Sequence, residues 1–199
     1  MGWKTPPTAW RFILNWRAAE PEPTGYGGES GGNETIDDTI RFRTAERADT
    51  PLILRFIREL AAYENLLDRV VADESTLEEW LFDRQKAEVI FALAEGKEVG
   101  FALFFHNFST FLGRAGLYLE DLYVCPEYRG RGYGKALRQR LAAIAVERGC
   151  GRLEWWCLDW NRPSIDFYRS LGAELMSDWT VYRIAGDTLT RLAEQVSGE

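Results

Sequence analysis

The chain has 199 residues, 46% of them hydrophobic and 28% charged, which is enough for one domain with a full apolar core. Its formal net charge of −7 argues against a nucleic-acid-binding protein, since such proteins usually carry a basic domain or stripe. Three cysteines without a CxxC pair suit a reducing compartment and predict a cytoplasmic protein, and a single histidine leaves little material for a metal site.

The N-terminal part differs in composition from the rest. Residues 1–37 contain four of the seven prolines and a Gly/Ser-rich run. Their apolar patch at residues 12–14 is too short for a membrane span or a signal peptide. We therefore expect a flexible extension over residues 1–37 and one domain over residues 38–196.

The domain opens with a strand followed by two helices. Residues 39–45 alternate apolar and polar side chains, which predicts a strand. Asp49 is a candidate N-cap for a helix with Pro51 in its first turn and an apolar stripe at helical spacing. Ser75 and Glu78 match a capping box, which predicts a second, short helix over residues 75–82.

Strand and helix signals then alternate to the C-terminus. Residues 87–105 predict a hairpin that turns at residues 95–97, and residues 117–124 predict the next strand. The remaining expected elements are a helix over 132–148, a strand over 152–160, a short helix over 164–171, a strand over 179–185 and a C-terminal helix. This alternation predicts an α/β (α+β) domain with one central sheet.

A glycine-rich turn, YRGRGYGKAL at residues 128–137, lies between a strand and a helix. Glycines allow a ligand close to the backbone, and basic residues at a helix start favour an anion. A Walker P-loop is excluded because Ala136 stands where Ser or Thr would bind magnesium. A dinucleotide GxGxxG motif is excluded because Lys135 and Leu137 stand where its third glycine would be.

The turn reads R-x-x-G-x-G over residues 129–134 and resembles the pyrophosphate loop of the GNAT superfamily of N-acetyltransferases. YLEDLYVCPEYRGRGYG, WNRPSIDFYRSLGA and RELAAYENL are similar to segments of its diamine acetyltransferase branch, so the resemblance covers residues 39–193. It implies the GNAT fold, with a central, mixed but mostly antiparallel sheet flanked by helices. It also implies acetyl-CoA as co-substrate, a primary amine of a small cation (a diamine, polyamine or thialysine-like compound) as acceptor, and a homodimer.

The resemblance also implies which residues bind acetyl-CoA. The pantetheine arm would run along the strand, and backbone N–H groups at the helix start would converge on the pyrophosphate, with nearby basic side chains adding charge-assisted bonds. Asn161 would both cap a helix and contact the CoA chain. The expected cofactor-binding residues are Leu122, Tyr123, Val124, Arg129, Gly130, Arg131, Gly132, Tyr133, Gly134, Lys135, Asn161, Ser164 and Tyr168.

Two acids, Glu120 and Asp121, interrupt the apolar strand before the turn. Strand alternation would put one carboxylate on each face, and burying either without a partner is costly. By resemblance Glu120 is the general base that removes a proton from the substrate ammonium, since a protonated amine has no nucleophilic lone pair. Alternatively Glu120 pairs with an arginine of a neighbouring strand; Asp121 is expected to be structural.

Tyr168 is the expected general acid. By resemblance it protonates the departing CoA thiolate, and a phenol with a pKa near 10 suits that donation. Its spacing from Ile165 and Leu171 on one helix face also fits a plain core tyrosine.

Anionic and aromatic residues suit a cationic acceptor. The expected substrate-binding residues are Tyr63, Glu64, Glu120, Glu154, Trp155 and Trp156, with at least one tryptophan packed in the core. The leading interpretation is an amine N-acetyltransferase acting by direct attack, without metal, nucleic acid or membrane. A protein or peptide N-acetyltransferase and a non-catalytic acyl-CoA sensor are the alternatives.

Overall fold

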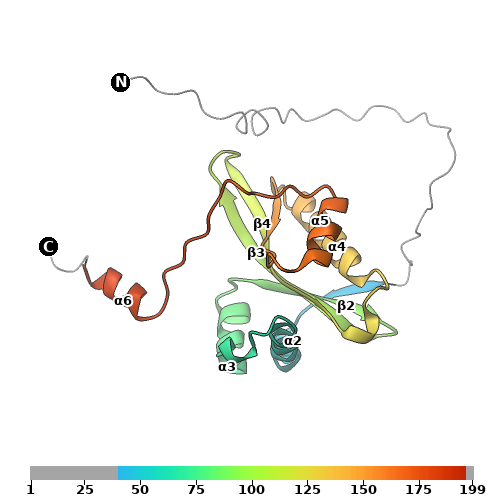
Figure 1. The fold of residues 1–199 in the computed structure, drawn as a ribbon. Helices are drawn as coiled ribbons and strands as arrows, with labels where there is room; N and C mark the ends of the chain where they lie inside the picture. Colours follow the sequence, from blue (N-terminus) through green and yellow to red (C-terminus); the bar gives the residue numbers. More distant parts are fainter. Residues whose placement is uncertain (1–39, 196–199) are drawn as a thin grey trace, which may run out of the picture. The chain divides into compact units, whose positions relative to one another are not determined.

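The computed structural model describes residues 40–195, so the extension expected over residues 1–37 lies outside the described part (Figure 1). The chain separates into two compact units with the boundary after Trp156. The single domain expected over residues 38–196 stays a prediction, and we describe each unit by itself.

The first unit is built on a five-stranded sheet whose order follows the chain, β1-β2-β3-β4-β5 (Figure 1). The first three pairings are antiparallel and β4 pairs with β5 in parallel, which confirms the expected mixed, mostly antiparallel sheet. The strands are β1 (Arg41–Thr44), β2 (Glu88–Ala94), β3 (Lys97–Ser109), β4 (Arg114–Val124) and β5 (Leu153–Trp155).

Helices accompany this sheet. The first unit contains α2 (Thr50–Tyr63), α3 (Glu74–Glu78), which continues into a π-helical turn, Glu79–Asp83, and α4 (Tyr133–Glu147). Three short 3-10 turns lie at Arg47–Asp49, Leu67–Arg69 and Pro126–Tyr128. Asp49 occupies the N-cap position of α2 and Pro51 its first turn, as predicted. The predicted capping box was wrong: α3 is capped by Asp73, whose carboxylate accepts from the Thr76 N–H at 2.8 Å.

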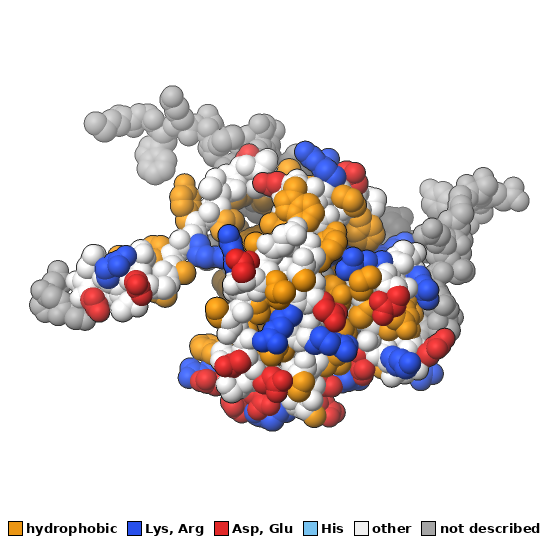
Figure 2. Space-filling model, turned by 60° about the horizontal axis from the view of Figure 1, so that its bottom comes forward, with side chains coloured by type: hydrophobic (Ala, Val, Ile, Leu, Met, Phe, Trp, Pro, Cys, Tyr) orange, Lys and Arg blue, Asp and Glu red, His pale blue; other side chains and the backbone are white. Residues whose placement is uncertain are grey.

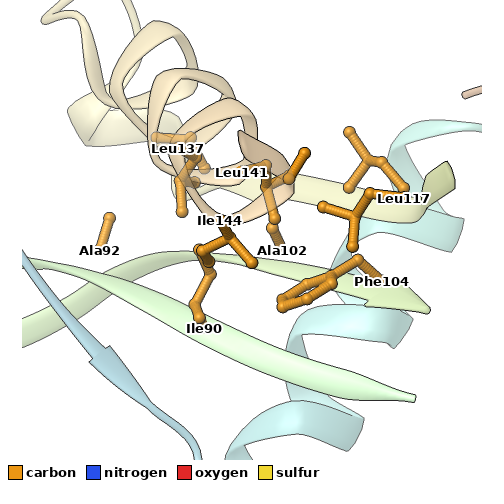
Figure 3. Close-up of a cluster of buried hydrophobic side chains, with 11 residues drawn as sticks. Ile90, Ala92, Ala102, Phe104, Leu117, Leu137, Leu141 and Ile144 are labelled. Atoms are coloured by element: carbon orange, nitrogen blue, oxygen red, sulfur yellow. The ribbon is translucent and has the colours of Figure 1, made fainter. Parts of the chain in front are cut away.

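Both faces of the sheet carry an apolar cluster. On one face α4 contributes Leu137, Leu141 and Ile144, which point toward the strands (Figure 3). On the other face α2 contributes Ile53 and Phe56, and the ring of Phe56 lies 5.7 Å from that of Tyr123 and 5.6 Å from that of Phe101. The helices cover the sheet because each presents one apolar stripe at helical spacing.

The hairpin between β2 and β3 confirms the predicted turn. β2 ends at Ala94 and β3 begins at Lys97. The two residues between them, Glu95 and Gly96, have φ angles of 49° and 79°, and two-residue hairpin turns with positive φ match the twist of the flanking strands. This turn sets the register that brings β3 beside β2.

Two predicted strands differ in the structure. The strand expected over residues 152–160 is limited to Leu153–Trp155, the three residues that pair with Leu117–Leu119 of β4. The strand expected over residues 179–185 does not form in the described chain, and these residues are exposed. An alternating pattern becomes a strand only where a neighbouring strand accepts its backbone hydrogen bonds, and none pairs with this segment here.

The second unit contains α5 (Arg162–Ser170) and α6 (Asp187–Glu194), which confirms both predicted helices. α5 begins two residues before the predicted start, and Gly172 follows it at a φ of 81°. Across the described residues, none of the helices combines the length and the apolar character needed to cross a membrane. On the face drawn in Figure 2, basic and acidic side chains are interspersed rather than gathered by sign.

Candidate active site

The glycine-rich turn joins β4 to α4. Gly130 has a φ of 74° and Gly132, the N-cap of α4, a φ of 86°. Both angles lie in the left-handed region, where a Cβ atom is strained whatever the space around it. These two glycines are therefore needed by the backbone of the turn itself.

The start of α4 exposes backbone N–H groups that precede the first bond of the helix. That bond runs from the Ala136 N–H to the Gly132 carbonyl at 2.9 Å. The N–H groups of Gly134 and Lys135 come before it, so the helix itself offers them no acceptor. Several such donors at the positive end of a helix form a site for an anion.

Position 134 favours glycine for a different reason from positions 130 and 132. Its φ lies outside the left-handed region, and a Cβ atom there would meet its nearest neighbour, the Arg138 Nη1, at an ordinary 3.6 Å. Neither backbone strain nor internal packing requires a glycine at this position. Close approach of a ligand to the backbone remains the physical reason for it.

The basic side chains of the turn differ in their contacts. Arg129 donates from Nε to the Val124 carbonyl at 2.9 Å, and its guanidinium lies over aromatic rings. The Arg131 guanidinium lies 5.4 Å from the ring centroid of Tyr128. No acidic residue occurs between positions 128 and 141, so the turn is a basic patch in an acidic chain.

The β4 strand leads to this turn. Leu122 and Val124 belong to the apolar cluster beneath α4, and Tyr123 belongs to the cluster beneath α2. β5 pairs with β4 only from Leu117 to Leu119, so in the described chain no strand covers the β5-side edge of β4 beyond that point. This free backbone edge can hydrogen-bond an extended amide-containing ligand.

A β-bulge interrupts β4 at Glu120. Leu103 of β3 lies opposite Asp121 and the next residue, Phe104, lies opposite Leu119, which leaves Glu120 without a cross-strand partner. Its side chain is exposed. Bulges occur often beside active sites because they redirect a side chain, and the bulge here exposes the carboxylate expected to be the base.

Asp121, which the sequence analysis expected to be structural, is a further candidate site residue. Burial, followed by the neighbouring Glu120 and Glu64 carboxylates, raises the pKa of Asp121 to about 6. Burial also raises the pKa of Glu64. No Lys or Arg forms an ion pair with Asp121 within residues 40–195. Glu64 and Glu120 have no ion pair within residues 40–195 either, so the three carboxylates form an acidic group without a counter-charge in the described part of the chain.

Tyr63 and Glu64 lie at the C-terminal end of α2. Glu64 belongs to the acidic group, and Tyr63 is stacked by Arg129, whose guanidinium carbon lies 4.7 Å from the ring centroid. Two expected substrate residues from α2 thus lie close to the strand and turn expected to bind acetyl-CoA.

The other expected substrate residues lie on β5 or directly after it. The Glu154 carboxylate accepts from the Asn107 amide at 2.7 Å and pairs with Arg152 at 2.9 Å, so it already has two partners. Trp155 packs against the cluster beneath α4, as expected for one of the tryptophans. Trp156 is exposed and meets the Tyr118 ring edge-on at 5.8 Å.

The remaining expected residues lie in the second unit. Asn161 caps α5, and its side-chain oxygen accepts from the Ser164 N–H at 3.4 Å, which confirms the predicted cap. Tyr168 is partly buried in the middle of α5, with its ring 6.0 Å from that of Phe167. The roles of these three residues toward a ligand stay predictions.

Comparison with known protein families identifies the family of this chain. A profile of the Acetyltransferase (GNAT) family matches residues 54–173, which include most of α2, the bulged strand, the turn and α5. The chain belongs to the GNAT acetyltransferase family. It is therefore an enzyme, an acetyl-CoA-dependent N-acetyltransferase.

Relatives match over most of the chain. A thialysine N-epsilon-acetyltransferase from Bos taurus is 37% identical over 166 residues, 77% of this chain and 97% of its own. An L-ornithine N5-acetyltransferase from Arabidopsis thaliana is 31% identical and covers 86% of this chain and 94% of its own. An integron cassette protein from the mobile metagenome of V. cholerae has a TM-score of 0.67 at 28% identity, over 78% of this chain and 98% of its own.

The chain's own residues fit acetyl-CoA. The N–H groups of Gly134 and Lys135 at the start of α4 suit phosphate oxygens, and the uncovered edge of β4 suits the amides of the pantetheine arm. No cluster of His, Cys, Asp and Glu that could hold a metal occurs within residues 40–195. Burial raises the pKa of the nearby Cys125 thiol, which opposes its use as a thiolate nucleophile.

Proposed function

We propose that the enzyme transfers the acetyl group of acetyl-CoA to a primary amine of a small cationic acceptor: a diamine, a polyamine or a thialysine-like compound. The observation that carries the proposal is the acidic group of Glu64, Glu120 and Asp121, since an ammonium ion supplies the counter-charge that it lacks. The relatives' names support it, because they specify thialysine and L-ornithine as acceptors.

Direct attack needs a base and an acid. Glu120, exposed by the bulge, is the proposed base, and the neighbouring Asp121, with a pKa of about 6, is ionised at neutral pH and holds the ammonium beside it. Tyr168 is the proposed donor to the departing thiolate. The thioester of acetyl-CoA supplies the activated acetyl group, and the residues orient the amine toward it.

Turnover is tested by following thiol release from acetyl-CoA with thialysine, ornithine, putrescine, spermidine and a lysine peptide as acceptors. We expect the small amines to support release. Loss of the base or acid should lower kcat by about 100-fold or more in Glu120→Gln and Tyr168→Phe while the dissociation constant of CoA changes little. Preference for the peptide would instead favour a protein acetyltransferase, and CoA binding without turnover on any acceptor would favour a sensor.

We also propose a cytoplasmic homodimer. Its support is the resemblance to the diamine acetyltransferases and the cysteine pattern. Light scattering on the purified chain is expected to give twice the chain mass of 22.8 kDa, and a value equal to one chain would contradict the dimer.

A further inference from the structure

Arg129 belongs to the glycine-rich turn, but its side chain points back toward the sheet and α2. Its Nε donates to the carbonyl of Val124, the last residue of β4. Its guanidinium carbon lies 4.7 Å from the ring centroid of Tyr63 and 5.5 Å from that of Tyr123. One side chain thus contacts the end of β4 and the end of α2, all within the first unit.

These contacts connect two parts of the proposed site. On one side of Arg129 is the turn, whose Gly130 and Gly132 shape the anion-binding start of α4. On the other side is Tyr63, which directly precedes Glu64 of the acidic group. A displacement of the turn therefore changes the packing on the last turn of α2.

The contacts use properties specific to arginine. A lysine at this position would keep the positive charge, but it has no Nε–H along its stem and no planar group to stack on a ring. The Tyr123 ring is fixed because it is buried beneath α2. The Tyr63 ring is 46% exposed, so the stacking Arg129 is one of the groups that determine its position.

We propose that Arg129 is a positioning residue that couples the acetyl-CoA loop to the acceptor side of the site. Binding at the turn stabilises the Arg129 conformation that holds Tyr63, and Tyr63 in turn orders Glu64 for the amine. By linkage, an acceptor then tightens CoA binding by the same factor by which CoA tightens acceptor binding. The acceptor half of this inference rests on the proposed function.

The coupling is measured as the ratio of the CoA dissociation constants without and with saturating thialysine, by titration calorimetry. We expect a ratio of about five or more in the unchanged enzyme and a ratio near one in Arg129→Lys and Tyr63→Leu. Tyr63→Phe keeps the ring and is expected to keep the ratio. Arg131→Lys is the matched control: it alters another arginine of the turn, which stacks on Tyr128, and should leave the ratio unchanged.

Hydrogen exchange separates this inference from the identity of the acceptor. With CoA alone, amides of residues 60–66 should exchange more slowly in the unchanged enzyme and in Arg131→Lys, but not in Arg129→Lys at CoA saturation. Slowing of equal size in Arg129→Lys, or none in the unchanged enzyme, would overturn the coupling. If thialysine does not bind but the exchange pattern appears, the acceptor assignment fails and the coupling stands.

Discussion

Two adjacent acids on β4 have different environments. Glu120 is exposed at the bulge, whereas Asp121 is partly buried beside two other carboxylates. Burial and like charge disfavour the ionised form of Asp121 in the folded chain, so the site retains a group that destabilises the fold at neutral pH. Such a cost is typical of a functional site.

Asp121→Asn is expected to raise the free energy of unfolding relative to the unchanged chain by on the order of 1 to 3 kcal/mol at about pH 7. The folded pKa of about 6 lies above the unfolded value of 3.8, so the penalty is complete above about pH 6 and absent below about pH 4. Urea unfolding at both pH values measures it. A stability difference that does not change between them would contradict the raised pKa, and amine-dependent activity should fall in the same variant.

The turn and α4 act as one element. The turn requires glycine at position 132 for its backbone, and at position 134 it leaves room for a ligand. We therefore expect Gly132 to affect both stability and ligand binding, and Gly134 to affect ligand binding alone.

Gly132→Ala is expected to lower the free energy of unfolding by about 1 to 2 kcal/mol, because alanine is strained at a φ of 86°, and to weaken CoA binding. Gly134→Ala should keep the stability within about 0.5 kcal/mol, since its φ is ordinary, but weaken CoA binding as well. Thermal unfolding and CoA titration distinguish them. Unchanged CoA affinity in Gly134→Ala would mean that no ligand approaches that backbone.

The packing of α4 predicts a second contrast. Leu141 is fully buried beneath the helix, so Leu141→Ala should cost about 2 to 5 kcal/mol of unfolding free energy through the cavity that it leaves. Val146, on the same helix, is 78% exposed, and Val146→Ala should change stability by less than about 0.5 kcal/mol. Denaturant unfolding of both variants provides the comparison, and equal losses would contradict the packing in Figure 3.

At the scale of the whole molecule, we expect all catalytic and binding residues to lie after the N-terminal extension. A chain lacking residues 1–37 should therefore bind CoA with an affinity within about twofold of the full chain and unfold at the same temperature. Calorimetric titration and thermal unfolding of the two chains test this. A large loss of affinity would assign part of the site to the extension.

The local pattern of the sequence predicted most of the strands and helices. The alternation in β1, the turn after β2 and the stripe of α2 are local signals, and the structure confirms them. The bulge at Glu120 was not predicted, because it depends on the register of β3 against β4 rather than on the β4 sequence. The strand expected over residues 179–185 failed for a related reason, since pattern alone does not provide a pairing partner.

The site residues also divide into those that the local sequence reveals and those that only the fold reveals. The glycine-rich turn could be recognised in the sequence because its glycines and basic residues are contiguous. The raised pKa of Asp121 could not be predicted, because its largest cause is burial, which depends on the fold, and one of its further causes is Glu64 from a different element. The contact of Arg129 with Tyr63 likewise joins residues far apart in the sequence, so only the folded arrangement reveals it.

The strand order has a consequence for how the chain folds. β3 and β4 each follow the strand they pair with after a short turn, so these two hairpins can form as each strand leaves the ribosome. The parallel pairing of β5 with β4 must wait until α4 has been synthesised, because the helix lies between them in the chain. Closure of that loop is slower than closure of the two hairpins, and β5 is the last strand of the sheet to be synthesised, so the connection that contains the glycine-rich turn completes the sheet.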